Sequence, residues 1–479
     1  MSKLKESNST ALYSSNQQGK KLPQYTAALS VCMGALSAGT VLGWTGNISE
    51  EMKASPYNGI KIDEDILGWI GSLATLGATA SCFPIAKLCD LIGRKFAMLS
   101  LTVPFMVGWL LIIFASNLAM LYVGRFLTGM AGLAFCVSAP IYTTEIAEKD
   151  IRGTLGSYFE LLLCTGIAVA YAIAMIVDIK TYTIIVAMLP LVFASTFIFQ
   201  PESPVYLLKC NKEKEARNAL IRLRGKAYNV DGEIQEIKNS IADETNYNIS
   251  ILESLKKKGT QKAFFICFSI MIFQQGAGIN AVVFYTDTIF KSAGSTLDPK
   301  LCTLIIGLIQ AVATFISSMV VDKLGRRILL ISSSLFVTIS GVSLGVFFTL
   351  QERELVSESV ISSLGFLPIT SLSIFIIMYA FGISPIPWLL PAELFPPEVK
   401  SVGGGGASTI NWFIAFLITK FYLNLKNSIG GDTTFYIFSL VALLGTIFIY
   451  FFVPETKGKT LDEIQKELNG IDNTKIEKK

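Results

Sequence analysis

The chain has 479 residues, of which 52% are hydrophobic and only 16% are charged. Soluble proteins carry about a quarter charged residues, so this composition excludes an ordinary water-soluble domain and indicates a membrane protein in contact with a lipid bilayer. The net charge of +4 is too small and too dispersed along the chain to suggest a nucleic-acid partner.

Enzyme chemistry is not indicated. The sequence contains no histidine, which removes the commonest general base, metal ligand and proton shuttle. The eight cysteines show no paired or metal-like spacing, and we find neither a nucleophile motif with a partner nor a phosphate-binding loop. We therefore expect no catalytic activity, no cofactor and no metal site.

Apolar runs long enough to cross a bilayer, about 20 residues each, recur along the whole chain. Six lie in the first half, near residues 25–44, 67–88, 97–115, 118–142, 155–177 and 181–199. Six more lie in the second half, near residues 263–290, 301–321, 328–350, 364–390, 402–422 and 435–453. The pattern predicts an all-α membrane protein with twelve transmembrane helices.

These runs divide the chain into two six-helix halves, a linker and two tails. The expected boundaries are an N-terminal tail 1–24, a first half 25–200, a linker 201–262, a second half 263–453 and a C-terminal tail 454–479. In the linker, apolar residues at helical spacing (Ala216, Leu220 and Leu223; Ile234, Ile237 and Ile241) predict short amphipathic helices, with a solvated linker as the alternative. In the C-terminal tail, Thr460 and Glu463 predict a capping box.

Lysine and arginine are concentrated in the linker and in the loops on its side of the membrane. These loops are every second one, because successive spans cross the membrane in opposite directions. The positive-inside rule therefore predicts that the linker and both termini are cytoplasmic. The sequon at Asn47 then lies outside and is the expected glycosylation site, whereas the sequons at Asn8 and Asn248 lie inside. The N-terminus lacks the order of a cleaved signal peptide, and we find no retention signal, so we expect the plasma membrane.

Short charged motifs repeat at the same step of each half. DLIGRK after the second run matches DKLGRR after the eighth, an acid precedes a base by seven residues after the fourth and tenth runs, and PES matches PET after the sixth and twelfth. Parallel repeats are typical of transporters whose halves rock about a central site. We expect a cytoplasmic gate, whose pairs form when that side is shut and separate when it opens. Its residues are Arg94, Glu145, Arg152 and Glu202, with Arg326, Arg327, Glu393, Lys400 and Glu455.

Polar side chains within the seventh run indicate a site for a neutral, hydroxylated ligand. Gln274, Gln275 and Asn280 lie in an otherwise apolar span, where unsatisfied polar groups are costly. Amides donate and accept hydrogen bonds, as sugar hydroxyls do. Glycines between them allow the helix to loosen so that they can face one cavity, while Trp388, beside a broken helix, could stack on a sugar ring. The alternative is that these side chains only join helices.

The motifs resemble those of the sugar-porter family of the major facilitator superfamily. GRFLTG, PESP, QQGAGINAVVFY, DKLGRR, PIPW, PAELFP and PETKGKT occur in the family's order, and several local features resemble its arthropod facilitated trehalose-transporter branch. The resemblance implies a major facilitator fold and adds Asn411 and Trp412 to the sugar contacts. Two further expected contacts depart from the family pattern: Glu160 replaces a sugar-binding glutamine, and Gln310 replaces an asparagine found in some relatives. Lys400 replaces an arginine of the gate.

The expected function is facilitated diffusion of trehalose, or of glucose as the next choice, by a chain that functions as a monomer. Glu160 leaves proton-coupled sugar symport open, because an acid within a span is often functional. Against coupling, the first run has no acid to face Arg125, whereas the proton-coupled porters that the chain resembles carry one there. A sugar sensor that does not transport is a further alternative, although the tail for signalling is short.

Overall fold

The computed structural model describes residues 19–469, apart from 149, 247–250, 295–296 and 397. Twelve segments are long and apolar enough to cross a membrane, which confirms the predicted number of spans. The first half contains α2 (Lys21–Gly43), α4 (Glu64–Ile92), α5 (Arg94–Ile113), α6 (Leu118–Leu133) with α7 (Phe135–Ile146), α8 (Arg152–Ile176), and α9 (Ile179–Ala187) with α10 (Leu189–Phe197). The second half contains α15 (Lys258–Gly276) with α16 (Ile279–Ser292), α17 (Pro299–Leu324), α18 (Arg326–Glu352), α20 (Leu367–Phe381) with α21 (Ile386–Leu394), α22 (Lys400–Ile429) and α23 (Gly431–Phe452).

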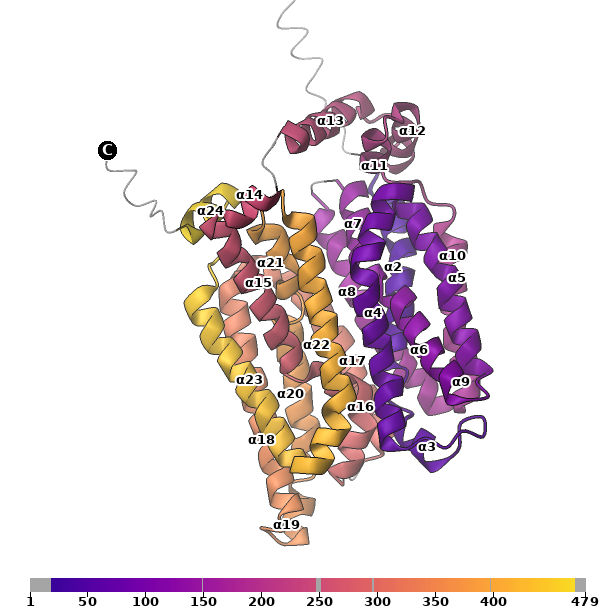
Figure 1. Cartoon of the computed structure of the whole chain (residues 1–479), viewed down its shortest axis with the longest axis vertical. Coiled ribbons are helices and arrows are strands. Elements are labelled where there is room, and N and C mark those ends of the chain that lie inside the picture. The colour runs from indigo at the N-terminus through magenta and orange to yellow at the C-terminus, as the bar shows by residue number, and fades with distance from the viewer. Residues whose placement is uncertain (1–18, 149, 247–250, 295–296, 397, 470–479) are drawn as a thin grey trace, which may run out of the picture.

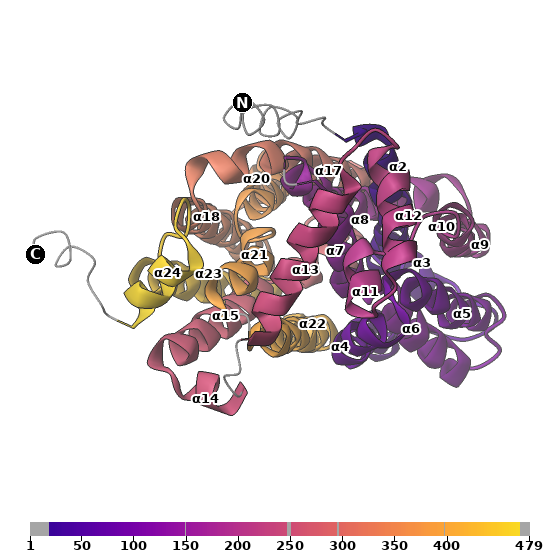
Figure 2. The same cartoon turned by 90° about the horizontal axis from the view of Figure 1, so that it is seen from above.

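The two halves stand side by side, with short helices at both ends of the bundle (Figures 1 and 2). One end carries α3 (Ser49–Ala54) and α19 (Glu358–Ser363), and we call it the α3 end. The other, which we call the linker end, carries α11 (Pro204–Lys209), α12 (Glu213–Arg224), α13 (Val230–Asn246), α14 (Ile251–Lys256) and α24 (Leu461–Leu468).

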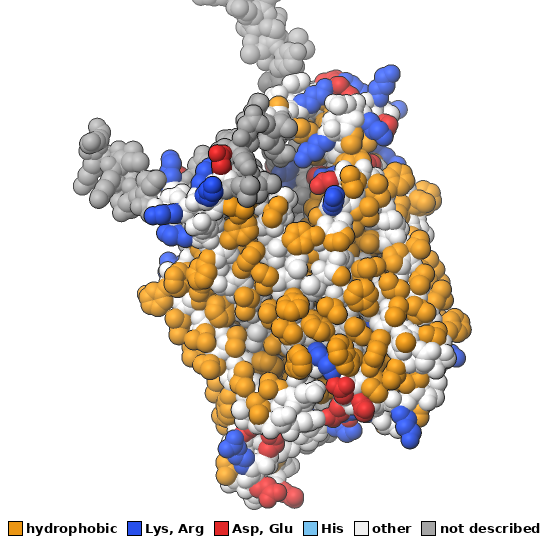
Figure 3. Space-filling view, in the orientation of Figure 1, with side chains coloured by type: hydrophobic (Ala, Val, Ile, Leu, Met, Phe, Trp, Pro, Cys, Tyr) orange, Lys and Arg blue, Asp and Glu red, His pale blue; other side chains and the backbone are white. Residues whose placement is uncertain are grey.

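The surface between the two ends is apolar. Figure 3 shows hydrophobic side chains over the middle of the molecule, with charged side chains gathered at the two ends. Large apolar residues such as Val103, Phe315 and Leu440 are exposed on this band, each by about half or more. Such a surface is unstable in water and stable against lipid tails. The chain is therefore a multi-pass membrane protein.

Helix starts at the α3 end follow from their capping residues. The side chains of Asp63, Asn117, Asp178 and Asp298 each accept a hydrogen bond from a backbone N–H in the first turn of α4, α6, α9 and α17. These oxygens satisfy N–H groups that have no partner within the helix. The caps stand beside apolar sequence, so they fix where each span begins.

Glycine allows the closest helix contacts within the first half. Gly39 on α2 and Gly166 on α8 lie against each other, with their Cα atoms and the carbonyls of Leu163 and Leu36 in the contact. Between the halves, α4 packs along α22 and α8 packs along α17. These two seams form the boundary across which the halves meet.

The helices predicted outside the membrane are present. α12 buries Ala216, Leu220 and Leu223. Ala216 and Leu220 form a small apolar cluster with Ile234 on α13, whereas Leu223 packs into the main apolar core. α24 begins with the predicted capping box, in which Thr460 and Glu463 bond each other's backbone N–H. The described residues of the linker are therefore largely helical, with α12 packed on α2 of the first half and α14 on α15 of the second.

Candidate functional site

The helix of the seventh span breaks at the glycines that follow the two glutamines. α15 ends at Gly276, α16 begins at Ile279, and Gly278 between them has a φ of +91°, in the left-handed region that favours glycine. On a continuous helix Gln275 and Asn280 would diverge by about 140°. The break instead brings them together, and Asn280 Nδ2 donates to Gln275 Oε1 at 2.6 Å.

Four amide side chains form one continuous hydrogen-bonded network inside the second half. Gln275 Nε2 donates to Asn411 Oδ1 at 2.8 Å, and Asn411 Nδ2 donates to Gln274 Oε1 at 2.5 Å. With Asn280 bonded to Gln275, the network joins α15, α16 and α22, and all four side chains are buried. The amides satisfy one another because an unpaired polar group would be costly in this apolar interior.

The network continues into the broken helix of the tenth span. Gln274 Nε2 donates to the backbone carbonyls of Ile383 and Ser384, at 2.7 and 3.1 Å, in the segment between α20 and α21. Gly382 leaves room there, because a Cβ would lie 2.5 Å from the carbonyl oxygen of Leu329. The break exposes backbone acceptors that a continuous helix would use internally.

A side-chain hydrogen bond connects this segment to the other half. Ser384 Oγ donates to Glu160 Oε1 at 2.7 Å, which joins the α20–α21 break to α8. The sequence indicated Glu160 but missed Ser384. Ser384 could have been noticed in the sequence, because it is a polar residue within a glycine- and proline-rich stretch that interrupts an apolar span. The structure thus links Glu160 to the amide network through Ser384.

The remaining expected contacts lie outside the network. Gln310 on α17 is buried one turn before Thr314, which donates to the Cys164 thiol on α8 at 3.4 Å. Trp388 on α21 is partly buried and packs against the main apolar core. Trp412, next to Asn411, is buried, and its indole N–H has no hydrogen-bond partner among the described residues. An unpaired buried donor of this kind calls for an explanation.

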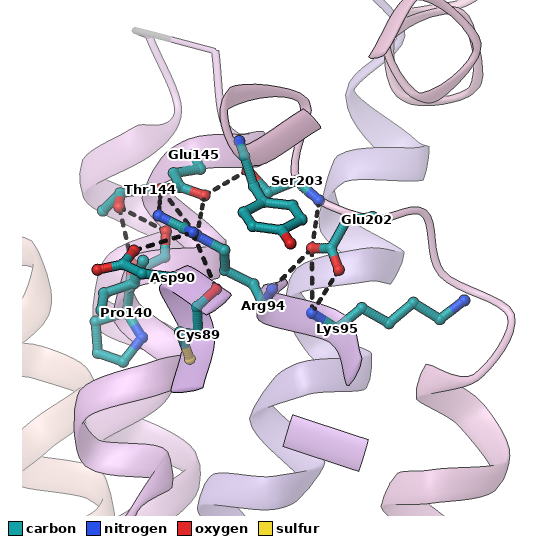
Figure 4. A network of polar contacts seen from close by, with 11 residues as sticks. Cys89, Asp90, Arg94, Lys95, Pro140, Thr144, Glu145, Glu202 and Ser203 are labelled. Atoms are coloured by element: carbon teal, nitrogen blue, oxygen red, sulfur yellow. Dashed lines mark hydrogen bonds and ion pairs between the residues drawn. The ribbon is translucent and has the colours of Figure 1, made fainter. Parts of the chain in front are cut away.

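At the linker end of the first half, acids hold the start of α5 (Figure 4). The Arg94 guanidinium bonds both oxygens of Glu145, at 2.9 Å from Nε to Oε2 and from Nη2 to Oε1. Glu202 accepts the backbone N–H groups of Arg94 and Lys95 at 3.0 to 3.1 Å, and Ser203 donates to Glu145. Burial raises the pKa of Glu202, although these N–H groups stabilise its charged form.

The second half repeats the arrangement. Arg326 Nε donates to Glu393 at 3.2 Å, and Glu455 accepts the backbone N–H groups of Arg326 and Arg327 at 3.0 and 3.1 Å. Thr456 takes the place of Ser203 and donates to Glu393 at 2.6 Å. Burial alone would raise the pKa of Glu455, but the backbone N–H groups, that of Lys457 first among them, hold it below its ordinary value. The charged repeat seen in the sequence is therefore a structural repeat.

The pairs of these networks connect helices of the same half. Each lies within a single half, so the pairs Arg94–Glu145 and Arg326–Glu393 join helices of one half and do not connect the two. Arg152 and Lys400 are exposed at the starts of α8 and α22 and contact no acid among the described residues. The acids thus pair across helices and anchor helix ends in this conformation, and their opening and closing as a gate stays a prediction.

The first network predicts a stability effect. Arg94→Lys is expected to lower the free energy of unfolding by about 1.5–3 kcal/mol, because lysine at this buried position cannot bond both oxygens of the partly buried Glu145. Thermal unfolding in detergent would measure the loss. The control is Arg217→Lys, whose pair with Asp231 is exposed, with side-chain exposures of 44% and 69%, and which should change stability by less than about 1 kcal/mol. Equal effects for the two would contradict the structural role of Arg94.

At the α3 end, polar contacts join the two halves directly. Glu50 on α3 pairs with Lys291 at 2.7 Å, Glu51 pairs with Lys300 at 2.7 Å, and Asp65 pairs with Lys420 at 2.5 Å. Among the described residues, the hydrogen bonds and ion pairs between the halves lie at this end and around Glu160, with none at the linker end. The structure is therefore closed at the α3 end.

Glu50 makes the most contacts in this closure. Burial by itself would raise the pKa of Glu50, but hydrogen bonds from Lys291, Lys53 and Thr288 lower it from 4.5 to about 2. A lowered pKa means that Glu50 stabilises the closed state fully above pH 4.5 and loses this effect as the pH falls towards 2. Its contribution should be constant between pH 5 and 8.

Removing the charge of Glu50 is expected to open the α3 end. In Glu50→Gln, the ammonium groups of Lys53 and Lys291 lose their shared anion, which favours separation of the halves. Spin labels at the exposed positions Lys61 and Glu358, with Cys136 and Cys210 replaced by serine, should report a longer-distance population. Glu213→Gln, in an exposed ion pair of the linker helices, should leave the distances unchanged. Unchanged distances in Glu50→Gln itself would contradict this role.

Asn47, the expected glycosylation site, lies inside the closed end. Asn47 is fully buried, and the Nδ2 atom to which a glycan would be attached donates to the carbonyl of Tyr171 at 2.9 Å. Helix packing at the closed end therefore shields the sequon in this conformation. The sequons at Asn8 and Asn248 lie outside the described residues.

The family profile described as "Sugar (and other) transporter" matches residues 14–468. The chain belongs to this sugar transporter family. It is 34% identical over 93% of its length to the facilitated trehalose transporter Tret1 of Polypedilum vanderplanki, covering 88% of that protein. It is 35% identical to a Tret1-2 homolog of Drosophila simulans, covering 93% of this chain and 91% of the relative. The Tret1 of Aedes aegypti is longer, and the match covers 55% of it.

Solved structures agree on the fold of this sugar transporter. The xylose transporter XylE of E. coli, in an inward open conformation, has a TM-score of 0.77 at 21% identity, covering 93% of this chain and 99% of that one. A partially occluded inward open form has the same TM-score at 22% identity, covering 91% and 99%. The chain thus has the major facilitator fold that the repeats and motifs predicted.

Proposed function

We propose that this sugar transporter moves trehalose, or a smaller sugar such as glucose, by facilitated diffusion. The observation that best supports this proposal is the network of four amide side chains, which is buried in the second half and linked to Glu160 in the first. Its members are Gln274, Gln275, Asn280 and Asn411. Each amide side chain can exchange its amide partner for a sugar hydroxyl, because a hydroxyl also donates and accepts hydrogen bonds. The relatives named as facilitated trehalose transporters support the choice of sugar and of mechanism.

Transport would proceed by alternating access between the two halves, residues 25–200 and 263–453, with 201–262 as the linker. The linker end is rich in lysine and arginine, so we place it and both tails in the cytoplasm, and we place the chain in the plasma membrane as a monomer. With the α3 end outside and closed, this conformation faces inward. Arg152 and Lys400, exposed here, are then free to meet acids of the opposite half when the cytoplasmic side shuts.

Arg125 favours facilitated diffusion over proton symport. It is fully buried, and its guanidinium bonds the carbonyl oxygens of Ile70 and Val41, at 2.9 and 3.2 Å, and lies 5.0 Å from the centre of the Trp44 ring. Among the described residues, no carboxylate pairs with it. The carboxylate that proton symport would need is therefore not found beside Arg125, and Glu160 on α8 keeps symport as a second candidate.

Uptake into liposomes tests the proposed substrate. The purified protein would be reconstituted, and uptake of labelled trehalose would be measured alone and in the presence of excess unlabelled glucose. Saturable trehalose uptake above that of protein-free liposomes supports the proposal. Uptake of labelled glucose without uptake of trehalose would contradict the choice of sugar, and uptake of neither would contradict sugar transport.

A further inference from the structure

The hydrogen bond between Ser384 and Glu160, at 2.7 Å, connects the two halves. It joins the α20–α21 break of one half to α8 of the other, at the level of the proposed sugar site. Both side chains are only partly buried, and we place the sugar between the halves beside them. The bond therefore joins the halves at a place where a sugar bound between them would meet the same two groups.

The segment that carries Ser384 is fixed to the rest of the site. The backbone N–H of Ser384 donates to the carbonyl of Tyr379 at 2.8 Å, and the backbone carbonyl of Ser384 accepts from Gln274 Nε2 at 3.1 Å. The preceding N–H, of Ile383, donates to Ser333 Oγ at 3.1 Å. The Ser384 hydroxyl is thus a positioned group, connected through Gln274 to the amides that would hold the sugar.

A carrier that works without a driving ion must complete its cycle empty. After releasing sugar inside, the halves must close around the vacant site, which removes water from its polar groups. A carboxyl and a hydroxyl left unpaired at that step would oppose closure. When sugar is bound, its hydroxyls can satisfy the same groups.

We propose that Ser384 is a positioning residue that pairs with Glu160 in place of sugar and so speeds the return of the empty carrier. The proposal rests on the proposed function, because only a carrier of sugar has a loaded and an empty return step. It assigns to Ser384 a role in the empty half of the cycle, distinct from the sugar contacts of the amide network.

Two transport assays separate the steps. Net uptake into sugar-free liposomes requires the empty carrier to return, whereas exchange at equal sugar concentrations on both sides does not. Ser384→Ala is expected to slow net uptake of labelled trehalose by about tenfold, roughly the effect of losing one such hydrogen bond, and to change exchange by less than about twofold. Ser384→Thr, which retains the hydroxyl, should restore net uptake. Glucose would be run in parallel as labelled substrate.

The outcomes are distinguishable. Equal slowing of both assays in Ser384→Ala would show a sugar contact or a folding defect and overturn the proposal. Unchanged rates in both assays would overturn it as well, because the hydrogen bond would then not limit the empty step. If the wild-type protein carries neither sugar in either assay, it is the proposed function that fails.

Discussion

Replacing Gln275 with alanine is expected to lower the kcat/KM of sugar uptake by about 10–100-fold. Gln275 is the central member of the network, because it donates to Asn411 and accepts from Asn280. Its removal leaves two buried amides without their partner, at a cost of about 1–3 kcal/mol each, and removes a contact for the sugar. Initial rates of trehalose uptake over a range of concentrations would measure the change.

A glutamine outside the network provides the matched control. Gln200 lies at the linker end of the first half, where its amide donates to Ser30 Oγ at 3.2 Å. Gln200→Ala should leave kcat/KM within about twofold, since it removes a single, partly exposed hydrogen bond. If Gln275→Ala is folded and transports like the wild type, the amide network is not the sugar site.

Introducing a single methyl group at Gly129 is expected to destabilise the first half by about 3 kcal/mol or more. Gly129 on α6 faces the backbone of Ala74 on α4, and a Cβ there would overlap the carbonyl oxygen and Cα of Ala74. Because backbone atoms cannot move aside as a flexible side chain can, the two helices must separate along their contact. Gly129→Ala should show a lower unfolding temperature and a smaller monodisperse fraction in size-exclusion chromatography.

Gly404 on α22 offers the opposite case. A Cβ at Gly404 meets no atom within 4 Å, so Gly404→Ala adds helix propensity without a clash. This change should leave stability unchanged or raise it by up to about 1 kcal/mol. If Gly129→Ala were as stable as Gly404→Ala, the close contact of α4 with α6 would be wrong.

The spans and the repeat could be predicted from the sequence because both depend on residues that are close together in the chain. An apolar run of about 20 residues in a bilayer forms a helix, because a helix satisfies its own backbone hydrogen bonds. The charged motifs DLIGRK and DKLGRR mark the ends of such runs, one in each half. The capping box at Thr460 is likewise local, since both of its members lie within one helical turn. Each of these features needs only neighbouring residues.

The partners of the polar groups could be predicted only in part. The sequence indicated Gln274, Gln275, Asn280 and Asn411, because amides in apolar spans must be satisfied. It did not indicate that they bond one another, which depends on the angle between α15, α16 and α22. Ser384 was missed for the same reason, because its importance comes from facing Glu160 across the two halves.

The sequence was least informative where burial is decided by distant packing. Asn47 lies in a sequon, but contacts with Tyr171 on α8 bury it. The acids Glu145 and Glu393 were expected to pair with basic residues across helices, but the sequence did not indicate that each partner is an arginine of the same half. Helix-end anchoring and gating use the same residue types, so composition could not distinguish them.

Following labelled trehalose to its final level in liposomes, with and without an inward proton gradient, tests the central claim most directly. A facilitative carrier has no means of coupling, so the internal concentration should rise to the external concentration and stop there in both conditions. Accumulation above the external concentration, only when the gradient is imposed, would contradict facilitated diffusion and identify Glu160 as the leading site of proton coupling.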